Sequence, residues 1–128
     1  MNKLFAAVSV VFMLMSSCTI GQTKYNIELD EFEKKMASEK YLLVDARTAE
    51  EFSDGHIEGA LNIAYFSATF SDDISKVGFE IPVLLYCRSG NRSSKAMKTM
   101  KELGFKEVYN LEGGIKGWIL EYNPVITE

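Results

Sequence analysis

The chain has 128 residues, of which 47% are hydrophobic and 25% are charged, and its formal net charge is -4. This composition is typical of one compact globular domain, and two domains would each be too small. The basic residues are scattered rather than gathered into the Lys/Arg stripe that a phosphate backbone requires, so nucleic acid is not expected as a partner. Nothing in the composition demands more than a monomer.

Residues 1–18 have the layout of a secretory signal peptide. A short basic start precedes an almost wholly apolar run at residues 4–15, which is shorter than the roughly 20 residues of a membrane span. Two small residues and Cys18 follow. This ending resembles the bacterial lipoprotein signal, in which the cysteine is lipidated and becomes the new N-terminus, although Met15 stands where such signals usually carry Leu. An ordinary cleaved signal peptide and an uncleaved anchor are the alternatives.

All three alternatives export the domain, and we expect it at the periplasmic face, anchored to the membrane through a lipidated Cys18. Residues 19–24 form a polar linker, and residues 25–124 form the domain. If Cys18 is lipidated or removed, Cys87 is the only remaining cysteine, so no intramolecular disulfide can form. A lone cysteine in an oxidising compartment requires a functional reason.

After the linker, helical and strand-like patterns alternate. Leu29, Phe32 and Met36 recur at helical spacing and predict an amphipathic helix over residues 29–37. Residues 41–44 are apolar and predict a buried strand that ends at Asp45.

A capping box predicts the next helix. Thr48 is suited to the N-cap position and Glu51 to the third helical position, while Gly55 is placed to end this short helix. Residues 60–63 predict another short strand. Residues 66–78 are polar with isolated aromatic residues and predict a loop with room for a helix.

The second half of the chain carries the clearest strand, over residues 81–86, with Pro82 near its start, where a missing N–H is tolerated. Cys87 follows this strand directly. From Ser93 the pattern becomes helical, with apolar residues on one face and lysines on the other, and this helix ends at Gly104. Residues 105–110 predict a last short strand.

Unbroken apolar strands that alternate with amphipathic helices predict an α/β domain with a mostly parallel sheet covered on both faces. Ligands of such sheets bind beyond the carboxyl ends of the strands. Cys87 lies at such an end.

The segment from Cys87 to Ser93 is expected to form an anion site. Backbone N–H groups at a helix N-terminus have no partners inside the helix, so a loop that wraps there directs several donors into one concavity. The helix dipole, Arg88 and Arg92 would all favour the thiolate of Cys87 and lower its pKa. A buried core cysteine is the alternative. The small, polar and charged residues that follow Cys87 cannot pack as core, which favours the functional interpretation.

Four segments resemble motifs of the rhodanese family, in the same order along the chain. They are LVDAR at residues 43–47, GHIEGALNI at residues 55–63, YCRSGNRS at residues 86–93 and LEGGIKGW at residues 111–118. The resemblance extends from about Tyr25 to Tyr122 and implies a rhodanese-like three-layer α/β domain. It also implies a sulfurtransferase in which Cys87 takes a sulfane sulfur, becomes a persulfide and passes the sulfur to an acceptor.

The same resemblance assigns roles to the loop residues. The loop amides of Arg88 to Ser93 would hold the negative persulfide and the charge of the transition state, and Arg88 and Arg92 would bind an anionic donor such as thiosulfate. A salt bridge between Asp45 and Arg47 would support the loop. A thiol, a protein dithiol or cyanide would accept the sulfur, and no cofactor is required. The expected binding residues are Arg88, Ser89, Gly90, Asn91, Arg92 and Ser93.

His56 is the only histidine, and the resemblance places it in a structural motif rather than beside Cys87 as a general base. A metal site is not expected, because one histidine and two distant cysteines cannot furnish its ligands.

Three other functions remain open. The dual-specificity cell-cycle phosphatases have a similar fold, but they place five residues between their cysteine and arginine, whereas four separate Cys87 from Arg92. We therefore expect a cradle too tight for a phosphate ester. A persulfide carrier or binding module with little free turnover is the second alternative. A catalytically idle interaction domain is the third, and the retained cysteine and arginines argue against it.

Overall fold

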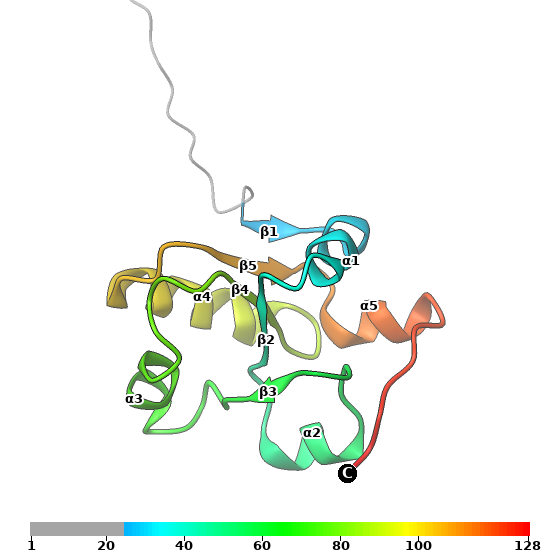
Figure 1. Ribbon diagram of the computed structural model, residues 1–128. Coiled ribbons are helices and arrows are strands. Elements are labelled where there is room, and N and C mark those ends of the chain that lie inside the picture. Colours follow the sequence, from blue (N-terminus) through cyan, green and yellow to red (C-terminus); the bar gives the residue numbers. More distant parts are fainter. Residues whose placement is uncertain (1–24) are drawn as a thin grey trace, which may run out of the picture.

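The computed structural model describes residues 25–128 as a parallel sheet between two layers of helices (Figure 1). The sheet has the strand order β1-β5-β4-β2-β3, and every neighbouring pair is parallel. The predicted α/β fold class is therefore confirmed. The elements in chain order are β1 (Asn26–Ile27), α1 (Leu29–Ala37), β2 (Leu42–Asp45), α2 (Ala49–Asp54), β3 (Leu61–Asn62), α3 (Phe70–Ser75), β4 (Val83–Tyr86), α4 (Asn91–Leu103), β5 (Val108–Leu111) and α5 (Gly114–Leu120).

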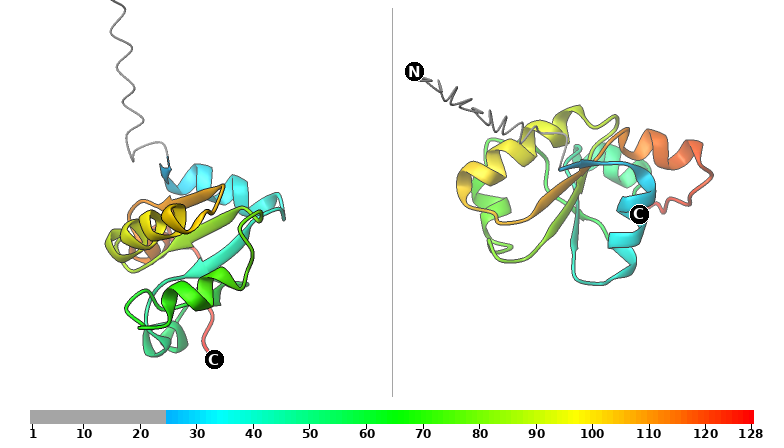
Figure 2. Two further views of the ribbon diagram at one scale, coloured as in Figure 1. Left: turned by 90° about the vertical axis from the view of Figure 1, so that its left-hand side faces the viewer. Right: turned by 90° about the horizontal axis from the view of Figure 1, so that it is seen from above.

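Two hydrophobic cores lie on opposite faces of this sheet. Strand β4 directs Val83 and Leu85 into the core beneath α3 and α4, and it directs Leu84 and Tyr86 into the core beneath α1 and α5. All four side chains are buried. A central strand that contributes to both cores needs apolar residues at every position, which explains its unbroken apolar sequence. The two helical layers are separated clearly in Figure 2.

The chain reverses its direction of winding between β2 and β4. It leaves β2 through α2 toward β3, and it leaves β4 through α4 toward β5 on the other side. The last residues of the two strands, Asp45 and Tyr86, are paired in register. Such a switch point opens a crevice beyond the carboxyl ends of the strands, where ligands of α/β sheets bind. Cys87 is the first residue beyond β4.

Several predicted elements agree closely with the structure, and others need correction. The helix over residues 29–37 and the Thr48/Glu51 capping box are present as predicted. The long helix begins at Asn91 instead of Ser93, because Gly90 in the left-handed conformation serves as its N-cap. The last predicted strand begins at Val108 instead of residue 105 and ends at Leu111. Strand β1 and helix α5 were not predicted.

Within residues 25–128, no helix is long and apolar enough to cross a membrane. The expected signal peptide, the linker and Cys18 lie outside these described residues.

Candidate active site

The Cys87 side chain sits at the switch point and is almost entirely enclosed, with a relative exposure of 1%. The backbone N–H of Gly90 donates a hydrogen bond to its Sγ at 3.1 Å, and the Ser93 hydroxyl donates another at 3.2 Å. Ser93 is itself fully buried in the first turn of α4. The sulfur is therefore held by donors from both the loop and the helix that follows it.

These donors determine the pKa of the Cys87 thiol. Burial raises the pKa, because it disfavours the charged thiolate. Hydrogen bonds from the Ser93 hydroxyl and from the backbone amides of Ser93, Ser89 and Gly90 lower it by more, so the pKa lies below its ordinary value. The sequence also predicts a lowered pKa for Cys87, but through the helix dipole and the two loop arginines. Neutral donors at short range are the main cause.

Neighbouring segments bind three carbonyls of the loop and hold its backbone in place. The N–H of Ile115 donates to the Cys87 carbonyl at 2.9 Å, and the N–H of Lys116 donates to the Arg88 carbonyl at 3.0 Å. The Asn110 side chain donates to the Gly90 carbonyl at 3.1 Å. Since a carbonyl and the following amide point in opposite directions, these bonds fix the amides of Arg88, Ser89 and Asn91, of which the Ser89 amide donates to Sγ.

Gly114 allows α5 to approach the loop this closely. Its φ is 58°, and a Cβ at this position would lie 2.5 Å from the carbonyl oxygens of both Cys87 and Arg88. Neither Gly114 nor Asn110 was singled out from the sequence. One feature of the sequence points to Asn110: its carboxamide lies near the end of an otherwise apolar strand. A buried polar group in such a strand must have a hydrogen-bond partner.

Asp45 and Arg47, the residues expected to support the loop, form a buried ion pair. Nη2 of Arg47 lies 2.7 Å from Oδ2 of Asp45, and its Nε donates to both carboxylate oxygens. Nη2 also donates to the carbonyl of Gly55 at 2.7 Å, which ties β2 to the end of α2. The Asp45 carboxylate contributes to the raised pKa of Tyr86, whose largest cause is burial. Within residues 25–128, no hydrogen bond joins the side chains of this pair to Cys87.

The two loop arginines, expected to bind the donor together, have different environments. Arg92 is bound by Glu51 of α2, with Nη1 2.6 Å from Oε1 and Nη2 2.9 Å from Oε2. Arg88 is exposed and has no ion pair within residues 25–128. Hydrogen bonding to Arg92 is the main cause that lowers the pKa of Glu51 to about 2. Glu51 was predicted only as a helix cap, and no local pattern reveals a partner 41 residues away.

His56 lies away from the sulfur, in a structural setting. Its Nδ1 donates to the carbonyl of Phe52 at 2.8 Å, and its ring stacks on that of Phe52 with centroids 3.6 Å apart. Its backbone pairs with Ile126 in both directions. Within residues 25–128 no hydrogen bond joins His56 to Cys87, and no cluster of three or more His, Cys, Asp or Glu side chains is arranged to hold a metal ion.

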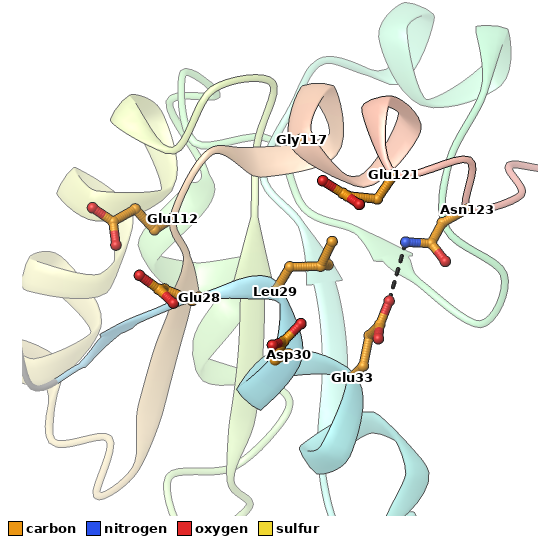
Figure 3. Close-up of a pocket in the computed structure, with 8 residues that line it drawn as sticks. All are labelled: Glu28, Leu29, Asp30, Glu33, Glu112, Gly117, Glu121 and Asn123. Carbon is orange, nitrogen blue, oxygen red and sulfur yellow. Dashed lines mark hydrogen bonds between the residues drawn. The ribbon is translucent and has the colours of Figure 1, made fainter.

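A hollow of about 560 Å³ lies between α1 and α5 and is acidic (Figure 3). Asn123 donates to Glu33 across it at 3.1 Å. It contains no nucleophile, and its charge would repel an anion. The anion-binding groups are at the Cys87 loop instead. The carboxylates around this hollow belong to Glu28, Asp30, Glu33, Glu112 and Glu121.

The fold and the site together define a parallel α/β domain with a buried cysteine at the carboxyl end of a central strand, held by donors from the loop and the helix that follow it. The chain belongs to the rhodanese family, because the rhodanese-like domain matches residues 28–121.

Known relatives are consistent with this assignment. The uncharacterized protein YqhL of Bacillus subtilis is 35% identical over 115 residues, which cover 90% of this chain and 87% of YqhL. The probable adenylyltransferase/sulfurtransferase MoeZ of Mycobacterium tuberculosis is 32% identical over 85 residues, 66% of this chain but only 22% of MoeZ. The human single-domain sulfurtransferase TSTD1 has a similar structure, with a TM-score of 0.65, 28% identity and coverage of 76% of this chain and 96% of TSTD1. The chain is thus a rhodanese-like domain related to sulfurtransferases.

Proposed function

We propose that the protein is a sulfurtransferase that moves a sulfane sulfur from a small anionic donor, such as thiosulfate, to a thiol, protein dithiol or cyanide-type acceptor. The observation that carries this proposal is the Sγ of Cys87 in a cradle of the Gly90 amide and the Ser93 hydroxyl. Donors of this kind stabilise a thiolate and also the terminal sulfur of a persulfide. Relatives named as sulfurtransferases support the same reaction class.

The reaction has two steps. The Cys87 thiolate attacks the outer sulfur of thiosulfate, a new sulfur–sulfur bond forms on Sγ, and sulfite leaves with the electron pair of the broken bond. An acceptor thiolate then attacks the terminal sulfur of the persulfide and takes it, which regenerates the Cys87 thiolate. The loop amides face negative sulfur in each state and need no rearrangement between the two steps.

Mass spectrometry of the purified protein tests the proposal. Incubation with thiosulfate should add one sulfur atom to Cys87, and a thiol or cyanide should remove it with turnover. Cys87→Ser should take up no sulfur. Loading without turnover would favour a persulfide carrier, whereas hydrolysis of aryl phosphates that is lost in Cys87→Ser would favour a phosphatase. Absence of loading by any sulfane-sulfur donor would overturn the proposal.

We further propose that the full chain is exported and anchored to the membrane at the periplasmic face through Cys18. The order of basic, apolar and small residues before Cys18 supports this localisation. The lipid-modified chain should begin at Cys18, partition with membranes and become soluble in Cys18→Ser. A cytoplasmic protein that retains Met1 would contradict the proposal.

A further inference from the structure

The positive charges around Cys87 are largely neutralised by the protein itself. Arg47 is bound by Asp45, and Arg92 is bound at both terminal nitrogens by Glu51. Arg88 is the one arginine of this end of the sheet that has no ion pair within the described part of the chain. An incoming donor therefore meets far less positive charge than three arginines suggest.

The negative charge of Glu51 is fixed in position and in protonation. Its carboxylate accepts from the backbone N–H and the hydroxyl of Thr48 in the capping box, as well as from Arg92. With a pKa of about 2, Glu51 is ionised near neutral pH. The charge of Arg92 is thus balanced by the carboxylate of Glu51.

Two further carboxylates border hollows beside the loop. Glu112 lines a hollow of about 380 Å³ together with Ser89 and Gly90. Asp54 lines another, of about 370 Å³, but Arg47, Arg88 and Lys116 line it too, so the remaining positive charge lies on this side of the loop. A second negative charge on a donor would be repelled on the Glu112 side, in addition to the repulsion from the Cys87 thiolate that attacks it.

We propose that this site prefers sulfane-sulfur donors with one negative charge over donors with two, and that Glu51 sets the preference by neutralising Arg92. The inference deepens the proposed function and rests on it. A thiosulfonate, R–SO₂–S⁻, represents the preferred class. The Cys87 thiolate attacks its outer sulfur, the bond between the two sulfurs of the donor breaks, and a sulfinate leaves with the electron pair. Two negative charges are present before and after the step.

Methanethiosulfonate and thiosulfate form a matched pair, because a methyl group in one replaces an anionic oxygen in the other. Their intrinsic reactivities differ, so the decisive quantity is how a variant changes the ratio of their kcat/KM values. Glu51→Gln removes the charge but keeps a side chain suited to the capping box and able to bond Arg92. We expect kcat/KM for thiosulfate to rise about tenfold relative to methanethiosulfonate, mainly through a lower KM.

Glu50→Gln is the control, because it makes the same charge change on an exposed position of α2 that does not contact Arg92. The donor ratio should remain within about twofold of the wild-type ratio. An unchanged ratio in Glu51→Gln overturns the inference and leaves the proposed function intact. Failure of both donors to load wild-type Cys87 overturns the proposed function, and the inference with it.

Wild-type protein provides a second measurement that does not depend on any variant. Methanesulfonate and sulfate also differ by one negative charge, and neither can donate sulfur. Methanesulfonate should protect Cys87 from alkylation by iodoacetamide at lower concentrations than sulfate does. Stronger protection by sulfate would contradict the inference.

Discussion

The buried Ser93 hydroxyl is the side chain that touches the Cys87 sulfur, at 3.2 Å, and it is the leading cause that lowers the pKa of the thiol. A hydroxyl is neutral, but it is held at short range inside the protein, where hydrogen bonds to charged groups are strong. Arg92 acts on Cys87 only through its charge. Much of this charge is offset by Glu51.

Ser93→Ala should therefore raise the pKa of Cys87. Above its pKa the thiol is ionised, so a higher pKa leaves less thiolate near neutral pH. The rate of alkylation by iodoacetamide should rise at higher pH than in the wild type, and sulfur loading near neutral pH should fall about tenfold. Ser94→Ala is the control, since this neighbouring hydroxyl makes no hydrogen bond with Sγ within residues 25–128. Identical pH profiles for Ser93→Ala and wild type would show that the hydroxyl does not stabilise the thiolate.

The buried pair of Asp45 and Arg47 predicts a large effect on stability. Their relative exposures are 0% and 6%, so Arg47→Met would leave the Asp45 carboxylate buried without its cation. We expect the free energy of unfolding in urea to fall by about 3–5 kcal/mol. Adding Asp45→Asn should recover part of this loss, because the uncompensated charge is then removed. Additive effects of the two substitutions would show that the pair is not coupled.

At the scale of elements, the contact between α5 and the Cys87 loop holds the backbone of the loop in place. The first amides of α5 fix the carbonyls of Cys87 and Arg88, and Gly114 provides the space for this approach. The contact is purely backbone, so the side chains of α5 give no sign of it.

Gly114→Ala should displace the loop from α5. Its Cβ would meet two carbonyl oxygens at 2.5 Å, and a φ of 58° is unfavourable for alanine. A shift of the loop by about 1 Å should lower the rate of sulfur loading about a hundredfold.

Gly117→Ala is the matched control on the same helix, because its Cβ would meet nothing within 4 Å. This control should load normally and be more stable by about 0.5–1 kcal/mol. Normal loading in Gly114→Ala would show that α5 does not position the loop.

Local patterns predicted most helices and strands, and they failed where tertiary contacts decide the structure. Capping residues and apolar spacing were sufficient for α1 and α2, and the apolar run was sufficient for β4. Strand β1 has two residues, too few to show a period. Helix α5 begins at Gly114 and contains Gly117, and glycine disfavours helices, so its packing against the loop and the burial of Ile115 and Trp118 in the core explain it.

The candidate site was predictable to a similar degree. The identity of the nucleophile and the direction of its pKa followed from a cysteine between a strand and a helix. The Glu51 partner of Arg92 and the Asn110 partner of Gly90 depend on which strands are neighbours, and spacing along the chain does not specify this. Local sequence patterns therefore could not predict that Glu51 neutralises the charge of Arg92 at the site.

At the scale of the whole molecule, the C-terminal tail holds α2 against the rest of the domain. The tail runs back beside α2 (Figure 1), where Ile126 and His56 exchange two backbone hydrogen bonds of 2.9 Å. Trp118 Nε1 donates to the carbonyl of Pro124 at 2.9 Å, which fixes the start of the tail. Helix α2 contributes no fully buried residue to the cores, so its position depends on these contacts, on the bond from Arg47 to Gly55 and on the ion pair between Glu51 and Arg92.

Removal of residues 124–128 should therefore loosen α2 and reduce stability. The three lost hydrogen bonds predict a decrease in the free energy of unfolding of about 2–4 kcal/mol. Amide hydrogen exchange should accelerate in α2 while it stays slow in β4, because local opening follows local contacts. Glu128→Gln is the control, since it neutralises only an exposed carboxylate that lies 3.7 Å from Nε2 of His56 and should cost less than about 0.5 kcal/mol. As α2 carries Glu51, the truncation should also weaken the hold on Arg92 and raise relative activity toward thiosulfate. Unchanged exchange in α2 would show that the helix is held by the sheet alone.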